Sequence, residues 1–192
     1  KQWNVGADFG FFKDRLTFGI DVYNKRTVDA IMQANIAGSL GSPSSNYTNI
    51  GELSNKGVEL TLTARPLTGE FKWSIYANAA YNKNRVEKLE NPEDINDASS
   101  MRALAVGHEV GEYYTYNWAG VDKETGAGLF YVDETFTTTT TDRREAKRTF
   151  QGVSPFAKYT AGFKNDFFYK GIQLSIFFTG QFDYAVHNRW QN

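Results

Sequence analysis

The chain has 192 residues, a formal net charge of -1 and no cysteine, and these facts exclude several classes of protein. A nucleic-acid binder needs a basic face to neutralise phosphates, so the near-neutral charge excludes that class. Without cysteine there is no disulfide framework, thiolate nucleophile or cysteine-based zinc site. No apolar run approaches the roughly 20 residues of a transmembrane helix, so a helical membrane protein is also excluded.

Along the chain, apolar and polar residues alternate with a period of two in six segments. This pattern is typical of β-strands with one apolar and one polar face. Short turns join the segments in pairs, so the sequence predicts three antiparallel hairpins. The paired segments are residues 3–11 with 16–23, 58–65 with 71–82, and 158–167 with 172–184.

The segment FKWSIYANAAYN shows how the two faces are separated. Its apolar face carries Phe71, Trp73, Ile75, Ala77, Ala79 and Tyr81, and its other face carries Lys72, Ser74, Tyr76, Asn78, Ala80 and Asn82. The polar faces of five of the segments carry charged residues: Asp8, Asp21, Glu59, Arg65, Lys72, Lys158, Lys164 and Asp166. A water-filled lumen solvates such charges and lipid does not, so we expect the Phe71 face to meet lipid and the Lys72 face to line a lumen.

The connections between hairpins are long and polar, at about 27–54, 87–111 and 133–154. Short turns at one end and long loops at the other are typical of an outer-membrane barrel, whose long loops are external. Six strands are too few for a wide pore, so we expect either a small plugged barrel or one sector of a larger wall. The alternative is a soluble β-sandwich that bears the charges on its outer faces and acts as a carbohydrate-binding module.

Residues 107–133, GHEVGEYYTYNWAGVDKETGAGLFYVD, depart from the alternation. Their glycines, aromatic pair, acidic residue and Thr-Gly turn resemble a segment of the SusC/RagA-like group of TonB-dependent outer-membrane transporters. The matching residues are Gly107, Gly111, Tyr113, Tyr114, Tyr116, Gly120, Asp122, Thr125 and Gly126. Residues 49–60, NIGELSNKGVEL, and residues 154–188 resemble two further elements of the same family in the expected order.

The resemblance implies an all-β, antiparallel transmembrane barrel of about 22 strands, of which residues 1–192 form a sector of about six to eight. It implies that the plug domain and the final strands lie outside this sequence. It also implies import of an oligosaccharide or peptide across the outer membrane of a Gram-negative, Bacteroidetes-like cell. The implied partners are outer-membrane lipid, a SusD-like surface lipoprotein as lid, and the TonB complex, reached through the missing N-terminal part.

Four aromatic residues, Tyr113, Tyr114, Tyr116 and Trp118, are the candidate binding residues. Aromatic rings stack on sugar faces or anchor an apolar partner, which makes these side chains candidates for contact with substrate or lid. Packing beneath an external loop is the alternative role.

No other group of residues predicts chemistry. Asp122, Glu124 and Gly126 lack the later ligands of a calcium loop, and we predict a hairpin turn there. His108 and His187 have no Cys or His at metal-ligand spacing. We therefore expect no metal, no cofactor, no catalytic residue and no enzymatic activity.

Overall fold

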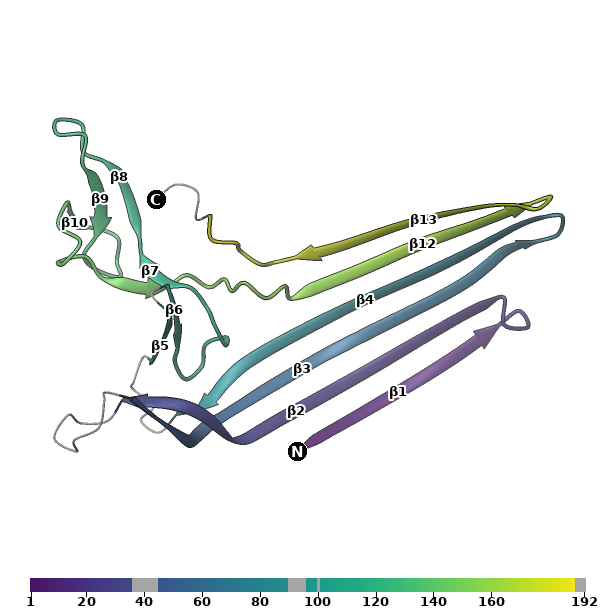
Figure 1. The fold of residues 1–192 in the computed structure, drawn as a ribbon, viewed down its shortest axis with the longest axis horizontal. Coiled ribbons are helices and arrows are strands. Elements are labelled where there is room, and N and C mark those ends of the chain that lie inside the picture. Colours follow the sequence, from purple (N-terminus) through teal and green to yellow (C-terminus); the bar gives the residue numbers. More distant parts are fainter. Residues whose placement is uncertain (36–44, 90–95, 100, 189–192) are drawn as a thin grey trace.

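The structure, a computed structural model, describes residues 1–35, 45–89, 96–99 and 101–188, and the regular elements in these ranges are β-strands (Figure 1). No helix among the described residues is long and apolar enough to cross a membrane. The strands are β1 Gln2–Phe11, β2 Leu16–Asn35, β3 Ser45–Thr68, β4 Phe71–Lys88, β5 Asn96–Ser99, β6 Arg102–Leu104, β7 Tyr114–Tyr116, β8 Trp118–Val121, β9 Gly128–Tyr131, β10 Thr139–Thr140, β11 Arg148–Phe150, β12 Tyr159–Tyr169 and β13 Ile172–Phe182.

One large antiparallel sheet dominates the molecule. Its strand order is β1-β2-β3-β4-β12-β13, and each strand pairs with the next in antiparallel fashion. These are the six strands that the alternation predicts, and they form the three predicted hairpins. The chain leaves the sheet after β4 and returns at β12, so β5 to β11 form an external segment at one end of the sheet (Figure 1).

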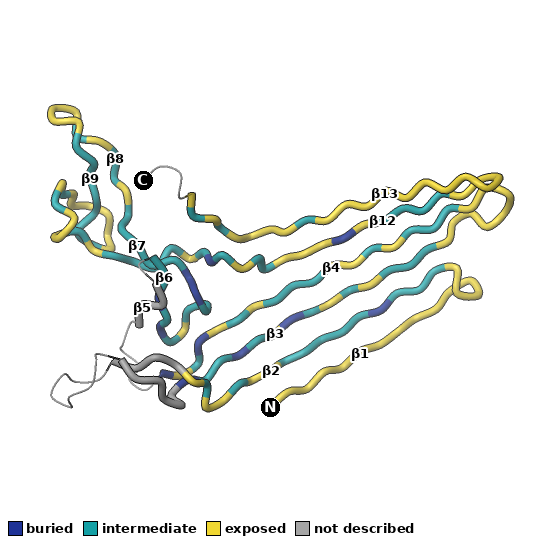
Figure 2. Tube along the Cα trace, in the orientation of Figure 1, coloured by how far each residue is buried: buried dark blue, intermediate teal, exposed yellow. Residues whose placement is uncertain are grey.

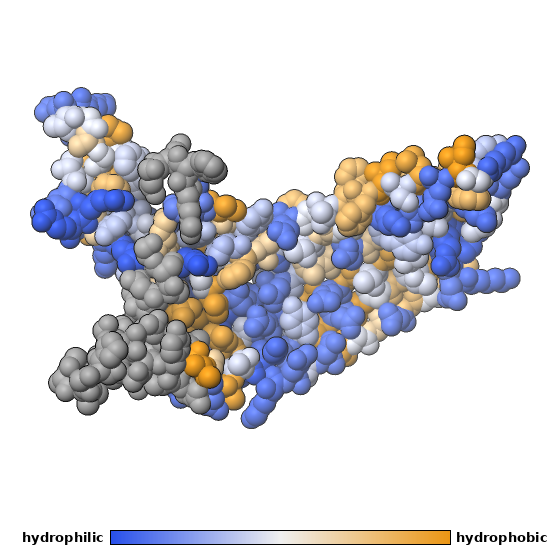
Figure 3. Space-filling model, in the orientation of Figure 1, coloured by the Kyte–Doolittle hydropathy of each residue, from blue (hydrophilic) through white to orange (hydrophobic). Residues whose placement is uncertain are grey.

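Rows of apolar side chains cross one face of this sheet. One row runs through Phe9, Phe18, Leu62, Ala77, Phe163 and Phe178. Figure 2 shows the sheet as a single layer with few buried residues, and Figure 3 shows hydrophobic side chains gathered along β13, where Phe178 is 62% exposed. A sandwich would cover an apolar face with a second sheet about 10 Å away, and the described residues place none there.

The opposite face of the sheet is polar, as predicted. Asp21 stands opposite Glu59 in the register, and Lys164 pairs with Asp166 at 2.7 Å. A hollow of about 460 Å³ on this face is lined by Gln2, Asn4, Asp21, Tyr23, Lys25 and Glu59. Water reaches these groups directly, which is the environment that their charge requires.

A few residues lie on the face that their chemistry would not predict. Phe177 stands opposite Lys164, and Phe168 stands opposite Lys72, so both rings belong to the polar face. The Lys72 ammonium lies 5.4 Å from the centre of the Phe168 ring, where a cation is attracted to the aromatic face. Asn165, conversely, lies in an apolar row opposite Ile75. The strand register determines on which face of the sheet a side chain lies. The apolar–polar alternation predicts that face for most residues but not for each one.

Glycines on the polar face stand opposite larger side chains. The pairs are Gly6 with Asp21, Gly57 with Tyr23, and Gly162 with Asn78. A Cβ built on each glycine would collide with the side chain of its partner. The missing Cβ lets that side chain lie flat across the neighbouring strand.

Three tight turns close the hairpins at the same end of the sheet (Figure 1). In the β1–β2 turn, Phe12, Lys13 and Asp14 adopt φ values of 55°, 57° and 60°. In the β12–β13 turn, Gly171 adopts a φ of 86°, which glycine tolerates without steric cost. The long connections lie at the opposite end, as the sequence predicts.

The predicted bounds of these long loops need correction. β2 continues to Asn35 and β3 begins at Ser45, so residues 27–35 and 45–54 of the predicted 27–54 loop belong to strands. Main-chain pairing continues beyond the alternating part because it does not depend on which side chains are apolar, and an Arg26–Glu52 ion pair joins the two strands there. Strands β5 and β6 lie within 87–111, and β10 and β11 within 133–154. Residues 36–44, 90–95 and 100 lie outside the described part.

A small core joins the external segment to the sheet. Val86 and Leu89 are fully buried, and the residues packed against them are Ala30, Leu53, Leu104, Val106 and Val110. The Val86 amide donates to the His108 carbonyl, and the Gly107 amide donates to the Val86 carbonyl, each at 2.9 Å. Residues 105–110 are thereby fixed against the end of β4.

Candidate functional site

The external segment contains three small sheets, and two of them carry three of the candidate aromatic residues. β11 pairs with β7, which places Tyr116 opposite Arg148 and Tyr114 opposite Phe150. β8, β9 and β10 form a separate three-stranded sheet that projects away from the large one (Figure 1). Side chains alternate between the faces of a strand, so Tyr114 and Tyr116 share one face of β7.

Tyr113 lies apart from the other three aromatic residues. Its hydroxyl donates to the Ala185 carbonyl at 3.3 Å, and its main chain bonds to Val153 and Gln151 at 2.9 Å each. The bond to Ala185 joins the external segment to the chain that follows β13, and the bonds to Val153 and Gln151 join Tyr113 to the chain that follows β11.

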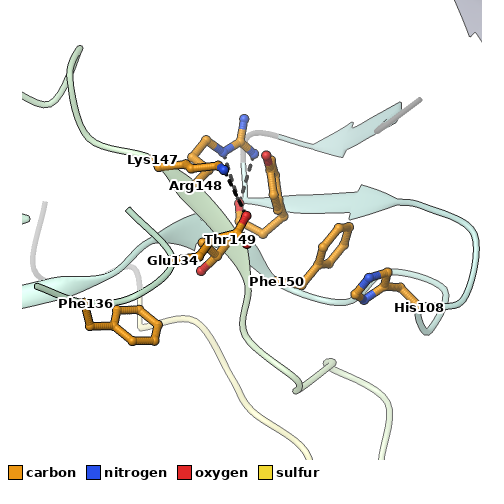
Figure 4. Close-up of a pocket in the computed structure, with 8 residues that line it drawn as sticks. His108, Glu134, Phe136, Lys147, Arg148, Thr149 and Phe150 are labelled. Carbon is orange, nitrogen blue, oxygen red and sulfur yellow. Dashed lines mark hydrogen bonds and ion pairs between the residues drawn. The ribbon is translucent and has the colours of Figure 1, made fainter. Parts of the chain in front are cut away.

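Tyr114 forms one wall of a hollow of about 470 Å³ (Figure 4), which is lined by His108, Tyr114, Glu134, Phe136, Lys147, Arg148, Thr149 and Phe150. The Arg148 guanidinium carbon lies 4.5 Å from the centre of the Tyr114 ring, and its Nε and Nη2 donate to the Tyr114 carbonyl at 3.2 and 2.9 Å. The Phe150 ring lies 4.8 Å from Tyr114 and 3.7 Å from the His108 ring. Aromatic rings and a cation thus meet in one concave surface.

A buried carboxylate supports this hollow from behind. Glu112 is 5% exposed, and its oxygens accept hydrogen bonds from the Gly152 amide at 2.9 Å and the Glu109 amide at 3.2 Å. Nδ1 of His108 lies 3.1 Å from Glu112 Oε2. Glu112 therefore fixes the orientation of His108 and holds residues 107–112 against the segment that follows β11. His108 is half-buried in the wall of the hollow.

Tyr116 and Trp118 gather around Phe130 of β9. The ring centre of Phe130 lies 6.1 Å from that of Tyr116 and 5.5 Å from that of Trp118. The guanidinium carbon of Arg143 lies 5.6 Å from the Tyr116 ring centre and 5.3 Å from that of Phe130. Trp118 remains 58% exposed. The four candidate residues therefore occupy three separate environments.

Ion pairs hold the charged residues around these rings. Lys147 lies 2.9 Å from Glu134, whose hydrogen bond and negative charge raise the pKa of the Lys147 ammonium. At the base of the segment, burial opposes the charge of Lys158, but Asp183 at 3.1 Å and Glu109 at 3.4 Å outweigh it and raise its pKa. Both lysines therefore carry a positive charge at neutral pH.

The turn predicted at Asp122 is confirmed. Asp122 accepts hydrogen bonds from the hydroxyl and amide of Thr125, each at 2.7 Å, and from the Glu124 amide at 3.1 Å. The hydroxyl bond, with the amide bonds, lowers the pKa of the Asp122 carboxyl below its usual range. Gly126 closes the turn at a φ of 72°.

Residues 1–179 match the family model described as TonB dependent receptor-like, beta-barrel. The chain belongs to this family. The TonB-dependent receptor P3 of Formosa agariphila is 30% identical over 93% of this chain and 20% of its own length. The TonB-dependent receptor SusC of Bacteroides thetaiotaomicron is 31% identical over 59% of this chain and 13% of its own length. The chain thus spans about a fifth or less of these receptors.

Solved structures agree with this family. The RagAB peptide transporter aligns with a TM-score of 0.79 and 27% identity, over 93% of this chain and 20% of its own. The RagAB peptide importer in its open-open state aligns with a TM-score of 0.83 and 26% identity, over 95% of this chain and 20% of its own. The predicted fold class is confirmed: the six-stranded sheet is a sector of an antiparallel TonB-dependent receptor barrel. In such a barrel the apolar face meets lipid and the polar face lines the lumen.

Several residues of the external part of this receptor barrel escaped the sequence analysis. Arg148 and Phe150 alternate in a segment of three residues, which is too short to give a periodic signal, and Arg143 lies in the charged run DRREAKR. The contacts of Arg148 and Phe150 follow from the pairing of β11 with β7, which joins residues more than thirty positions apart. Arg143 is identified only by its contacts with Tyr116 and Phe130. Two glycines that precede Glu112, Gly107 and Gly111, both have positive φ and were the available signal for a folded loop there.

Proposed function

We propose that this chain is a wall sector and external segment of an outer-membrane, TonB-dependent nutrient importer. The single observation that carries the proposal is the two-faced six-stranded sheet with its tight turns at one end and its folded external segment at the other. An apolar face suits lipid, and a polar face suits a wet lumen. The family match and the RagAB likeness support the same function. The location is the outer membrane of a Gram-negative bacterium related to the Bacteroidetes.

The proposed cargo is an oligosaccharide or a peptide. The RagAB relatives are described as a peptide transporter and importer, which supports the peptide class. The aromatic residues Tyr114, Tyr116 and Trp118 support the saccharide class, because aromatic rings stack on sugar faces. We assign these three residues to contact with the substrate or lid. Transport needs no covalent chemistry, and we propose no enzymatic activity and no cofactor.

Two partners complete the proposed importer. A SusD-like surface lipoprotein would cover the external end as a lid, where the segment of β5 to β11 stands. The TonB complex would supply energy through a plug domain outside these 192 residues. Nucleic acid is not a proposed partner, since the charge of the chain is near zero.

The first test is an immunoblot of fractionated cells with antibodies against this chain, using heated and unheated samples. We expect a heat-modifiable band in the outer-membrane fraction, several times larger than the 21.7 kDa of these residues. A soluble band near 21.7 kDa would overturn the proposal.

The second test measures import. Cells that lack the receptor should lose growth on either an oligosaccharide or a peptide mixture supplied as the sole carbon source, and cells that lack TonB should show the same defect. Growth on both carbon sources without the receptor would contradict the import function even if the location proved correct.

A further inference from the structure

Arg143 is a cation held between two aromatic rings without an acidic partner among the described residues. Its guanidinium lies over Tyr116 and Phe130, at 5.6 and 5.3 Å from the ring centres. A guanidinium is attracted to the face of an aromatic ring and still carries five N–H donors, which suit a planar anion such as a carboxylate. The side chain is exposed, so an external ligand can reach that edge.

The carboxylates close to Arg143 in the chain are committed to other groups. Asp142 pairs with Arg144 at 3.2 Å, and Glu145 accepts a 2.8 Å hydrogen bond from the Thr140 hydroxyl. Glu134 pairs with Lys147, and Asp133 accepts the amides and hydroxyls of its own turn. The acidic groups nearest to Arg143 in the chain are therefore engaged elsewhere, and Arg143 has no acidic partner among the residues that the structure describes.

An exposed ring lies beside this charge. The indole of Trp118 packs over Gly128, where a Cβ would collide with it, and stands edge-on to Phe130 at 5.5 Å with an interplanar angle of 83°. Phe130 thus contacts both the Arg143 guanidinium and the Trp118 indole. More than half of the Trp118 surface stays in water, so the indole offers a flat apolar platform beside a cation.

We propose that Trp118, Phe130 and Arg143 bind a uronic acid residue of an acidic oligosaccharide. The C–H face of the pyranose stacks on the Trp118 indole, and the carboxylate accepts paired hydrogen bonds from the edge of the Arg143 guanidinium. This inference names a substrate class for the import function proposed above and takes its biological meaning from that function.

The union of ring and charge in one sugar residue favours a uronate over an acidic peptide. In a uronic acid the carboxylate is bonded directly to the ring, so the stacked ring and the charge keep a fixed separation. Trp118 and Arg143 both contact the Phe130 ring, so a flat platform and a cation are grouped around one residue. An acidic peptide carries its carboxylates on flexible side chains, and ordering them costs conformational entropy.

The test measures binding to the full-length receptor purified in detergent, by calorimetry and by quenching of tryptophan fluorescence. The probes are tetrasaccharides of galacturonate and of glucuronate, neutral maltotetraose and tetraglutamate. We expect at least one acidic saccharide to bind about tenfold more tightly than maltotetraose and tetraglutamate, and to lose affinity as salt is raised.

Matched variants locate the site. Arg143→Gln should abolish the preference for the acidic saccharide, and Arg143→Lys should restore only part of it because an ammonium lacks the planar fork. Trp118→Ala should weaken binding and remove the fluorescence change. The control is Arg144→Gln, because the Arg144 side chain is 91% exposed and already pairs with Asp142. Heat-modifiable migration confirms that each variant is folded.

Equal binding of neutral and acidic saccharides, stronger binding of tetraglutamate, or equal effects of the Arg143 and Arg144 variants would each overturn the proposal. So would an Arg143→Gln receptor that keeps its affinity for the acidic saccharide but no longer copurifies with the surface lipoprotein, because Arg143 would then serve the lid. Uptake measured in parallel separates the two proposals: binding without import refutes the importer and leaves this site standing, and import without acidic-saccharide binding refutes this site alone.

Discussion

The indole of Trp73 donates a hydrogen bond of 3.0 Å from Nε1 to Oδ1 of Asn165 on the apolar face of the sheet. Asn165 stands in the same row as Ile75 on β4 and Ile176 on β13, where lipid offers no hydrogen-bond partner. Trp73 satisfies that acceptor from the neighbouring strand. A polar residue is thereby tolerated on a face that otherwise excludes it.

Replacing Trp73 by Phe should therefore destabilise the barrel beyond the loss of ring area. We expect the free energy of unfolding to fall by about 1–3 kcal/mol, the usual cost of leaving a buried polar group without its partner. Adding Asn165→Leu to Trp73→Phe should recover most of this loss. The measurement is urea unfolding of the refolded receptor in lipid vesicles. Tyr81→Phe is the control, because the Tyr81 hydroxyl makes no hydrogen bond to another described residue; an equal loss in this control would contradict the explanation.

Adjacent residues of β13 test which face meets lipid. Ile176→Arg places a charge on the apolar face, and we expect a loss of about 2–4 kcal/mol in the same unfolding measurement if the site is near the bilayer centre. Ser175→Arg places the same charge on the polar face opposite Asp166, and we expect little loss. Similar losses in the two variants would show that the faces are assigned wrongly.

Glu112 should control the order of the external segment. Glu112→Ala leaves the Gly152 and Glu109 amides without their acceptor, and we expect the loss of these two hydrogen bonds to a charged group to cost about 1–3 kcal/mol in all. Hydrogen exchange of residues 107–112 and 148–154 should accelerate together, since one carboxylate joins them. Glu124→Ala, on the exposed Asp122 turn, is the control. Faster exchange in only one of the two segments would argue against a shared anchor.

The Asp133 turn should open in acid. The Thr135 hydroxyl and the amides of Thr137 and Thr138 lower the pKa of the Asp133 carboxyl well below its ordinary value of 3.8. A lowered folded-state pKa contributes stability that is present above 3.8 and lost as the pH falls toward the folded-state value. Protection of residues 133–138 against hydrogen exchange should be constant near neutral pH and decline below about pH 4. Asp133→Asn should show reduced protection at every pH, and an acid-insensitive turn in the unmodified receptor would refute the explanation.

Sequence reasoning succeeded where a residue faces one of two different media. Each strand of the large sheet meets lipid on one side and water on the other. The alternation of apolar and polar residues therefore predicts which side chains share a face, as in the row from Phe9 to Phe178. The external segment meets water on most sides, so its strands are short and carry no comparable pattern. Tyr114 and Phe150 are brought together by long-range pairing, and no local signal encodes that pairing.

The sequence selects the candidate aromatic residues by type and gives no information on how they are grouped. Their division into three environments depends on which strand faces which ring. Tyr113 immediately precedes β7, and its contacts differ from those of Tyr114, the first residue of that strand. Arg143 becomes a candidate binding residue only because two aromatic rings contact it. The charged run DRREAKR by itself does not show which of its residues has such contacts.

The glycine pairs of the polar face affect how far side chains extend from the wall into the lumen of the barrel. Where Asp21, Tyr23 and Asn78 lie flat over Gly6, Gly57 and Gly162, the inner wall has low relief. A molecule in the lumen can approach the main chain more closely at these pairs than at positions where side chains extend into the lumen. At these three positions it meets little side-chain bulk, so movement along the wall there requires little rearrangement of side chains.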